Sequence, residues 1–135
     1  MKKTTKQFII VDDDPFSNFL SKTVLLKLYG EVVIKDFLVP ELALDYIKKE
    51  YEFSKAKEKI ILLLDINMPT ITGWEFLDLF KDYPVSVQNL FQVYILSSSI
   101  DPVDIERAKQ NPLVMGFIEK PLNRGVLVEL LEGNG

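Results

Sequence analysis

The chain contains no cysteine and no histidine. The absence of cysteine excludes disulfide bonds, thiolate-bound metals and cysteine nucleophiles. The absence of histidine excludes a Ser-His-Asp triad, histidine-bound zinc and any role as the donor of a phosphohistidine. Chemistry in this protein must therefore rely on carboxylates, amines, hydroxyls and backbone groups.

Long apolar runs and dense basic runs are also missing. No stretch approaches the roughly 20 apolar residues that span a bilayer, and the apolar run near the start is too short for the core of a signal peptide. We therefore expect a cytoplasmic protein without a membrane partner. The net charge is −4 and Lys and Arg do not cluster, which argues against direct binding of nucleic acid.

The length and composition are those of one ordinary globular domain. The chain has 135 residues, of which 47% are hydrophobic and 27% charged. We expect a single domain over residues 1–135, with its core at about 6–132 and no output domain.

Short runs rich in Ile, Val and Leu predict five buried strands. These are Gln7–Val11, Glu31–Phe37, Lys59–Leu64, Phe91–Leu96 and Val114–Ile118. Five helices are predicted to follow them, and capping residues, prolines or a glycine mark their starts at Asp14-Pro15, Pro40, Gly73, Asp101-Pro102 and Asn123. This alternation predicts an α/β fold with an open, doubly wound, five-stranded parallel sheet and five helices.

Polar residues follow four of the predicted strands. They are Asp12-Asp13, Asp65, Ser97 and Lys120-Pro121. Because ligands of parallel sheets lie at the carboxyl ends of the strands, we expect these side chains to meet in one crevice. Converging carboxylates repel each other unless a cation lies among them, and Mg²⁺ takes oxygen ligands of this type. A lysine and a hydroxyl beside such a metal would suit a transferred phosphoryl group.

Four motifs occur in order along the chain: VDDDP, LLLDINMPTITG, LSSS and FIEKP. As a set they resemble the motifs of the response-regulator receiver domain of the two-component family, in its single-domain, chemotaxis-regulator-like form. The resemblance covers nearly the whole chain and implies the flavodoxin-like receiver fold. It also implies a signalling protein that takes a phosphoryl group from a histidine kinase or a histidine phosphotransfer protein and then switches a surface that binds a downstream target.

The resemblance assigns the chemistry to particular residues. Asp65 is the implied phosphoryl acceptor, and a carboxylate can form an aspartyl phosphate in this way. The implied Mg²⁺ ligands are three carboxylates and one backbone carbonyl, namely Asp12, Asp13, Asp65 and Asn67. Asp12 is expected to act mostly through a metal-bound water. Asp14 is left outside the site, because its place before Pro15 suits a helix N-cap.

The remaining family positions lie on the last two strands. Ser97 matches the hydroxyl that contacts a phosphoryl oxygen, and Ser98 fits the small residue that follows it. Lys120 matches the family's lysine, and Pro121 implies a cis peptide bond at this place. Phe117 lies at the family's aromatic switch position, but an ordinary core aromatic is an equally good interpretation.

Two alternatives stay open from the sequence. A haloacid dehalogenase-like phosphatase could use Asp12–Asp14 as its nucleophile motif, but its downstream acids could only be Glu129 and Glu132, and Asp65–Pro69 would have no role. A receiver-like binding module that is never phosphorylated is the second alternative. In the preferred interpretation the protein is not a turnover enzyme, although it assists its own phosphorylation and dephosphorylation.

Overall fold

The apolar runs form one parallel sheet in the computed structural model, which describes residues 6–53 and 58–132. The strands are β1 (Lys6–Val11), β2 (Val32–Phe37), β3 (Ile60–Asp65), β4 (Phe91–Ser97) and β5 (Val114–Glu119). Their order in the sheet is β2-β1-β3-β4-β5. All five predicted strands are confirmed, each to within one residue at either end.

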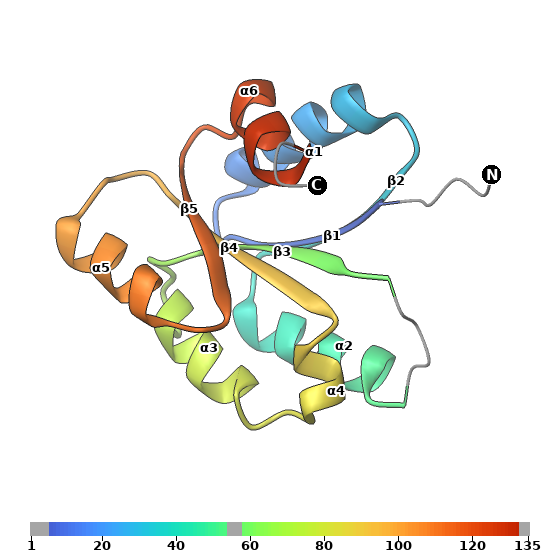
Figure 1. Ribbon diagram of the computed structural model, residues 1–135, viewed down its shortest axis with the longest axis vertical. Helices are drawn as coiled ribbons and strands as arrows, with labels where there is room; N and C mark the ends of the chain where they lie inside the picture. Colours follow the sequence, from blue (N-terminus) through green and yellow to red (C-terminus); the bar gives the residue numbers. More distant parts are fainter. Residues whose placement is uncertain (1–5, 54–57, 133–135) are drawn as a thin grey trace.

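Helices cover both faces of this sheet (Figure 1). They are α1 (Pro15–Tyr29), α2 (Pro40–Tyr51), α3 (Gly73–Phe80), α4 (Val85–Gln88), α5 (Pro102–Gln110) and α6 (Arg124–Leu127), which the π-helical turn Val128–Glu132 extends. The doubly wound α/β fold is confirmed. The described residues contain six α-helices where five were predicted, because the four-residue α4 is too short to produce a helical pattern in the sequence.

The capping residues begin and end the helices as their chemistry suggests. Asp14 precedes α1 and its side chain accepts a hydrogen bond from the backbone N–H of Phe16 at 3.0 Å. Gly30 ends the same helix with a φ of 71°, a backbone conformation that favours glycine. The assignment of Asp14 to a helix cap is therefore confirmed.

The core lies in two layers because the sheet is covered on both sides. One layer packs the sheet against α2, α3 and α5, and the other packs it against α1 and α6. All six residues of β3 are buried, since this strand lies in the middle of the sheet. The carboxyl end of β3 therefore brings Asp65 into the interior of the molecule.

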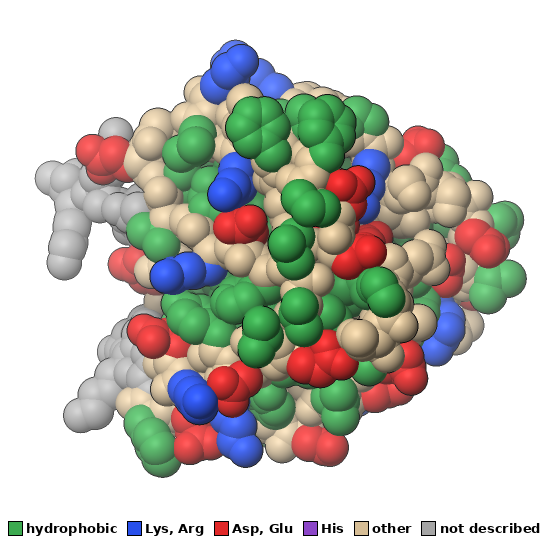
Figure 2. Space-filling model, turned by 180° about the vertical axis from the view of Figure 1, so that it is seen from behind, with side chains coloured by type: hydrophobic (Ala, Val, Ile, Leu, Met, Phe, Trp, Pro, Cys, Tyr) green, Lys and Arg blue, Asp and Glu red, His purple; other side chains and the backbone are tan. Residues whose placement is uncertain are grey.

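Near its start α1 exposes apolar side chains and buries polar ones, whereas Val24 further along the helix packs partly against the core. Phe16 and Phe19 are 66% and 61% exposed, whereas Asn18, Ser21 and Leu25 are buried. The polar residues point inward because the first turn of α1 packs against the end of β1, where a polar site forms. Figure 2 shows the molecule from behind, with hydrophobic side chains among scattered acidic and basic ones.

None of the described helices is both long enough and apolar enough to cross a membrane.

Candidate functional site

The carboxyl ends of four strands meet at one edge of the sheet. Asp12 follows β1, Asp65 ends β3, Ser97 ends β4 and Lys120 follows β5. The chain crosses from β1 to β2 on one side of β1 and returns to β3 on the other, so this edge is a topological switch point. The sequence-based prediction that these residues share one crevice agrees with this arrangement.

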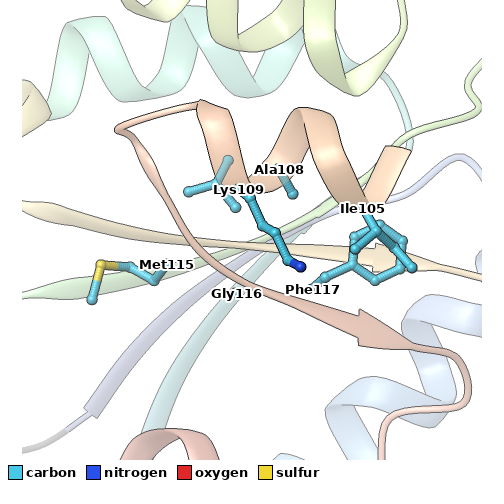
Figure 3. A pocket seen from close by; sticks show the side chains of 7 residues that line it. Ile105, Ala108, Lys109, Met115, Gly116 and Phe117 are labelled. Carbon is cyan, nitrogen blue, oxygen red and sulfur yellow. The ribbon is translucent and has the colours of Figure 1, made fainter. Parts of the chain in front are cut away.

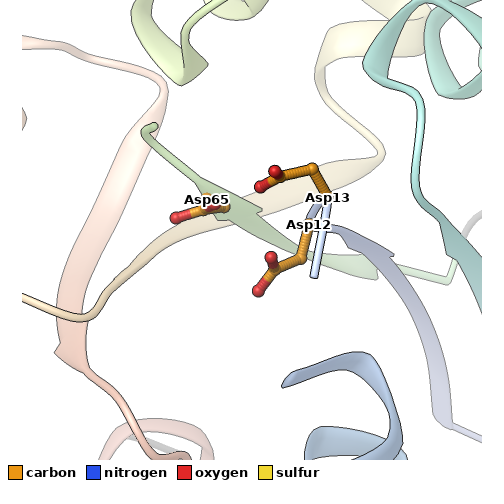
Figure 4. A group of neighbouring side chains, drawn as sticks. All are labelled: Asp12, Asp13 and Asp65. Atoms are coloured by element: carbon orange, nitrogen blue, oxygen red, sulfur yellow. The ribbon is translucent and has the colours of Figure 1, made fainter. Parts of the chain in front are cut away.

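Three carboxylates form a cluster at this edge (Figure 4). One carboxylate oxygen from each of Asp12, Asp13 and Asp65 lies within 4.8 Å of the other two. Asp12 and Asp65 are only 1% and 6% exposed. A hard divalent cation such as Mg²⁺ prefers oxygen ligands of this kind, so the donor set fits the metal that the sequence implies. The backbone carbonyl of the exposed Asn67 remains a predicted fourth ligand.

Lys120 supplies a positive charge to this cluster. Its Nζ lies 2.7 Å from Oδ2 of Asp12 and 3.5 Å from Oδ1 of Asp65. Burial lowers the pKa of Lys120, but the hydrogen bonds and charges of the two aspartates outweigh it, so the pKa is raised. Lys120 is therefore fully protonated at neutral pH and available to an anion at the site.

The negative charge of Asp65 is disfavoured in this environment. Burial and the neighbouring charge of Asp12 raise its pKa from 3.8 to about 6, although Lys120 and the backbone N–H of Ile66 oppose the shift. The Ile66 N–H donates to Oδ1 of Asp65 at 2.9 Å. A cation that entered the cluster would relieve this cost.

Asp12 is held from several directions. Its Oδ1 accepts from the backbone N–H of Asp14 at 3.0 Å, and its Oδ2 accepts from the hydroxyl of Ser17 at 2.7 Å. The side-chain amide of Asn18 donates to the backbone carbonyl of Asp12 at 3.0 Å. Because both carboxylate oxygens of Asp12 already accept hydrogen bonds, the half-buried Asp13 is the carboxylate of this pair that is more available to a cation.

Ser17 and Asn18 did not follow from the sequence. They lie five and six residues beyond Asp12, in a helix whose apolar residues gave the only visible pattern. A signal was nevertheless present, because two adjacent small polar residues one turn after an N-cap are placed to face the preceding strand end.

Ser97 is buried beside the cluster and makes its hydrogen bonds locally. Its hydroxyl donates to the backbone carbonyl of Ser99 at 3.0 Å and accepts from the Ser99 N–H at 3.3 Å. The backbone carbonyl of Ser97 accepts from the N–H of Lys120 at 2.7 Å, which joins the ends of β4 and β5. The peptide bond between Lys120 and Pro121 is cis.

The loop after Asp65 folds back against β3. The backbone N–H of Gly73 donates to the carbonyl of Ile66 at 2.9 Å, and a Cβ at Gly73 would lie only 2.5 Å from the backbone oxygen of Asp65. Only glycine fits there, and α3 begins at this residue, directly against the end of β3. The Trp74 indole N–H donates to Asp104 of α5 at 3.0 Å, which links α3 to α5.

A pocket lies between α5 and β5, beyond the acidic cluster (Figure 3). It has a volume of about 350 Å³, and its lining includes Ile105 and Lys109 from α5 and Phe117 from β5. Phe117 is half-buried and packs against the core on the side of the sheet that α5 covers. Its place in the structure fits a core aromatic and leaves the switch role as a prediction.

Comparison with known proteins gives one family and several related structures. The model of the response regulator receiver domain matches residues 8–132. A response regulator receiver protein from Dyadobacter fermentans is 31% identical, with a TM-score of 0.85 and coverage of 96% of this chain and 97% of its own. A two-component response regulator from Cytophaga hutchinsonii is also 31% identical, with a TM-score of 0.85 and 97% coverage of both chains.

A more distant similarity is to a two-component response regulator from Legionella pneumophila, at 25% identity and a TM-score of 0.76, covering 95% of this chain and 96% of that one. A comparison with curated proteins gave no match.

Proposed function

The chain belongs to the response regulator receiver domain family, and on that premise we propose that Asp65 accepts a phosphoryl group from a histidine kinase or a histidine phosphotransfer protein. The observation that carries the proposal is the position of Lys120 between Asp12 and Asp65, beside a cluster of three carboxylates. A nucleophile, a metal-binding donor set and a cation for the phosphoryl oxygens are thus within reach of one another.

In the proposed reaction an oxygen of Asp65 attacks phosphorus. Oδ1 is already engaged by the Ile66 N–H and by Lys120, so we assign the attack to Oδ2. The new O–P bond forms as the P–N bond to the donor imidazole breaks, and the electron pair of that bond stays on the imidazole nitrogen, which takes up a proton. Lys120 pairs with a phosphoryl oxygen as charge develops there.

Mg²⁺ held by Asp12, Asp13, Asp65 and the Asn67 carbonyl would neutralise the carboxylates and the phosphoryl charge. Burial, and after it the charge of Asp12, raises the pKa of Asp65, and a cation bound among these carboxylates would oppose that shift. The same arrangement supports return to the resting state, in which a water oxygen attacks phosphorus, the bond to Asp65 breaks and phosphate leaves. The domain thus takes part in the chemistry without being a turnover enzyme.

The signal is proposed to pass from Ser97 to the face formed by α5 and β5. The Ser97 hydroxyl would exchange its bond to Ser99 for a phosphoryl oxygen, and Phe117 would respond to the movement. The pocket between α5 and β5 lies on the face that would bind a downstream protein. We place this exchange in the cytoplasm, without nucleic acid or membrane as a direct partner.

The dehalogenase-like alternative loses support from the position of Asp14. Its motif would require Asp12 and Asp14 to act together, whereas Asp14 is exposed and caps α1. An intact set of acids with Lys120 likewise favours phosphorylation over a passive binding module.

The test is phosphorylation of Asp65→Asn by an acyl phosphate donor. We expect no labelling of this variant, because the amide is nearly isosteric with the carboxylate but is a poor nucleophile. Mass spectrometry after borohydride trapping of the acyl phosphate identifies the modified residue, and Asp14→Asn serves as the matched control that keeps labelling. Label that persists in Asp65→Asn and disappears in Asp12→Asn would place the nucleophile after β1 and support the phosphatase instead.

A further inference from the structure

Two donors share a single oxygen of Asp12. The hydroxyl of Ser17 and the ammonium of Lys120 each lie 2.7 Å from Oδ2. Asp12 is 1% exposed, so bulk water has almost no access to this carboxylate. Oδ2 therefore depends on these two side chains for its hydrogen bonds.

The proposed function sets these donors in different roles. Lys120 must turn toward a phosphoryl oxygen on Asp65, and in doing so it weakens or leaves its contact with Asp12. A buried carboxylate that loses a charged partner is costly unless another donor remains. The Ser17 hydroxyl comes from α1 and has no part in the phosphoryl chemistry, so it can stay on Oδ2 throughout.

We infer that Ser17 is a positioning residue that holds Asp12 in place while Lys120 transfers from Asp12 to the phosphoryl group. This inference rests on the proposed phosphorylation of Asp65 and names a residue through which that site works. Without the hydroxyl, Lys120 would be the remaining side-chain donor to Oδ2, and Asp12 would hold it back from the phosphoryl group.

The first turn of α1 is built to present Ser17 in this position. Asp14 caps the helix and Pro15 fixes its first residue, so the orientation of the turn is set before Ser17 is reached. The next residue, Asn18, donates to the backbone carbonyl of Asp12. The same turn therefore fixes both the side chain and the backbone of Asp12.

The surroundings also give a matched control. A pocket of about 220 Å³ beside the site is lined by residues that include Ser17, Ser21 and Lys120. Ser21 lies one turn further along the same helix and is buried. It shares the residue type, the helix and the pocket with Ser17, but Asp12 Oδ2 accepts its hydrogen bond from Ser17.

The experiment compares Ser17→Ala, Ser17→Thr and Ser21→Ala with the wild type. The rate of Asp65 phosphorylation by an acyl phosphate is measured at saturating Mg²⁺. We expect Ser17→Ala to react about tenfold more slowly, the size expected for a lost hydrogen bond to a charged group. Ser17→Thr keeps a hydroxyl on Cβ and should react at the rate of the wild type. Ser21→Ala should also match the wild type.

A second measurement needs neither metal nor phosphate. The ammonium protons of Lys120 are followed by ¹⁵N NMR in the metal-free protein. In Ser17→Ala they should exchange with water more slowly than in the wild type, because Asp12 then retains Lys120 more firmly. A general loosening of α1 would have the opposite effect on these protons.

Three results would overturn the inference: Ser17→Ala as fast as the wild type, Ser17→Thr as slow as Ser17→Ala, or Ser21→Ala equally slow. A wild-type protein that takes no phosphoryl group would remove the proposed function and this inference together. If the wild type is phosphorylated and Ser17→Ala is unaffected, the inference alone fails.

Discussion

The two sides of the site differ in how their polar groups are held. On the side of β1 and β3, Asp12 accepts hydrogen bonds from the start of α1 and forms an ion pair with Lys120. Segments at both ends of the domain therefore hold its side chain. On the side of β4, the Ser97 hydroxyl bonds within its own turn, to Ser99. The acidic side is therefore held by several parts of the chain, whereas under the proposed function the Ser97 hydroxyl would have to exchange its partner for a phosphoryl oxygen.

This difference separates chemistry from signalling. A ligand shifts a conformational equilibrium only through interactions that differ between the two states. In the proposed reaction the acids would gain a partner without losing their hydrogen bonds, and Lys120 would move only within the site, from Asp12 to the phosphoryl group, so these groups would contribute mainly to binding. The proposed exchange at Ser97 would change which groups are bonded at the ends of β4 and β5, so it is the step that we expect to be transmitted to the rest of the domain.

The largest effect is expected from removing a metal ligand on the fixed side. Asp13→Ala should weaken Mg²⁺ binding by about 100-fold, because it removes a carboxylate that no other group replaces. Asp14→Ala is the control and should change the affinity little, since Asp14 caps α1. Fluorescence of Trp74, the single tryptophan, provides the titration because its residue follows the loop that packs on Asp65. A greater loss in Asp14→Ala would show that the wrong acid has been assigned to the metal.

A smaller effect is expected on stability, through the buried charge of Asp65. The folded protein raises the pKa of Asp65 from 3.8 to about 6, so it holds the proton more tightly than the unfolded chain does. Stability of the metal-free protein should therefore fall as pH rises from about 4 to about 6 and stay lower above that interval. The shift in the pKa of Asp65 corresponds to a loss of at most about 3 kcal/mol in the free energy of unfolding. Water at the mouth of the site screens part of the charge, so we expect a loss of about 2 kcal/mol.

Asp65→Asn should remove this contribution. We expect its free energy of unfolding at pH 7, measured by urea titration without metal, to exceed that of the wild type by about 2 kcal/mol and the difference to shrink at pH 4. Asp78→Asn, an exposed acid of α3, is the control. A variant that is no more stable than the wild type at pH 7 would mean that Lys120 already balances the charge of Asp65.

The sequence predicted most of the fold and the first layer of the site. The position of the central strand β3 followed from its apolar run, because a strand buried on both faces favours apolar residues throughout. The polar residues after the strands were expected at the carboxyl edge of the sheet, and Asp12, Asp65 and Lys120 lie together there. The short α4 and the irregularity that leaves Met115 out of the β4–β5 register have no such signal, because neither creates a periodic pattern.

The contacts that hold the site could not be derived in the same way. Phe16 and Phe19 recur at helical spacing in α1, but their side chains are exposed, and the polar Ser17 and Asn18 contact Asp12 instead. Hydrophobic periodicity identifies a helix and fails to orient it when the buried partner is a polar strand end. The local bonding of Ser97 was likewise invisible, since three consecutive serines offer equivalent hydroxyls.

The smallest effect is expected on the β4 side, where the hydroxyl of Ser97 changes partner. Ser97→Ala should still bind beryllofluoride, a phosphoryl mimic, with Mg²⁺, because the nucleophile and the acids are untouched. The amide NMR shifts of Val114–Ile118 on binding should fall to about half of those in the wild type, since one hydroxyl bond of about 1 kcal/mol no longer favours the switched state. Ser98→Ala is the matched control and should respond like the wild type. Full shifts in Ser97→Ala would instead assign the coupling to another route, such as the hydrogen bond between Trp74 and Asp104, which joins α3 to α5.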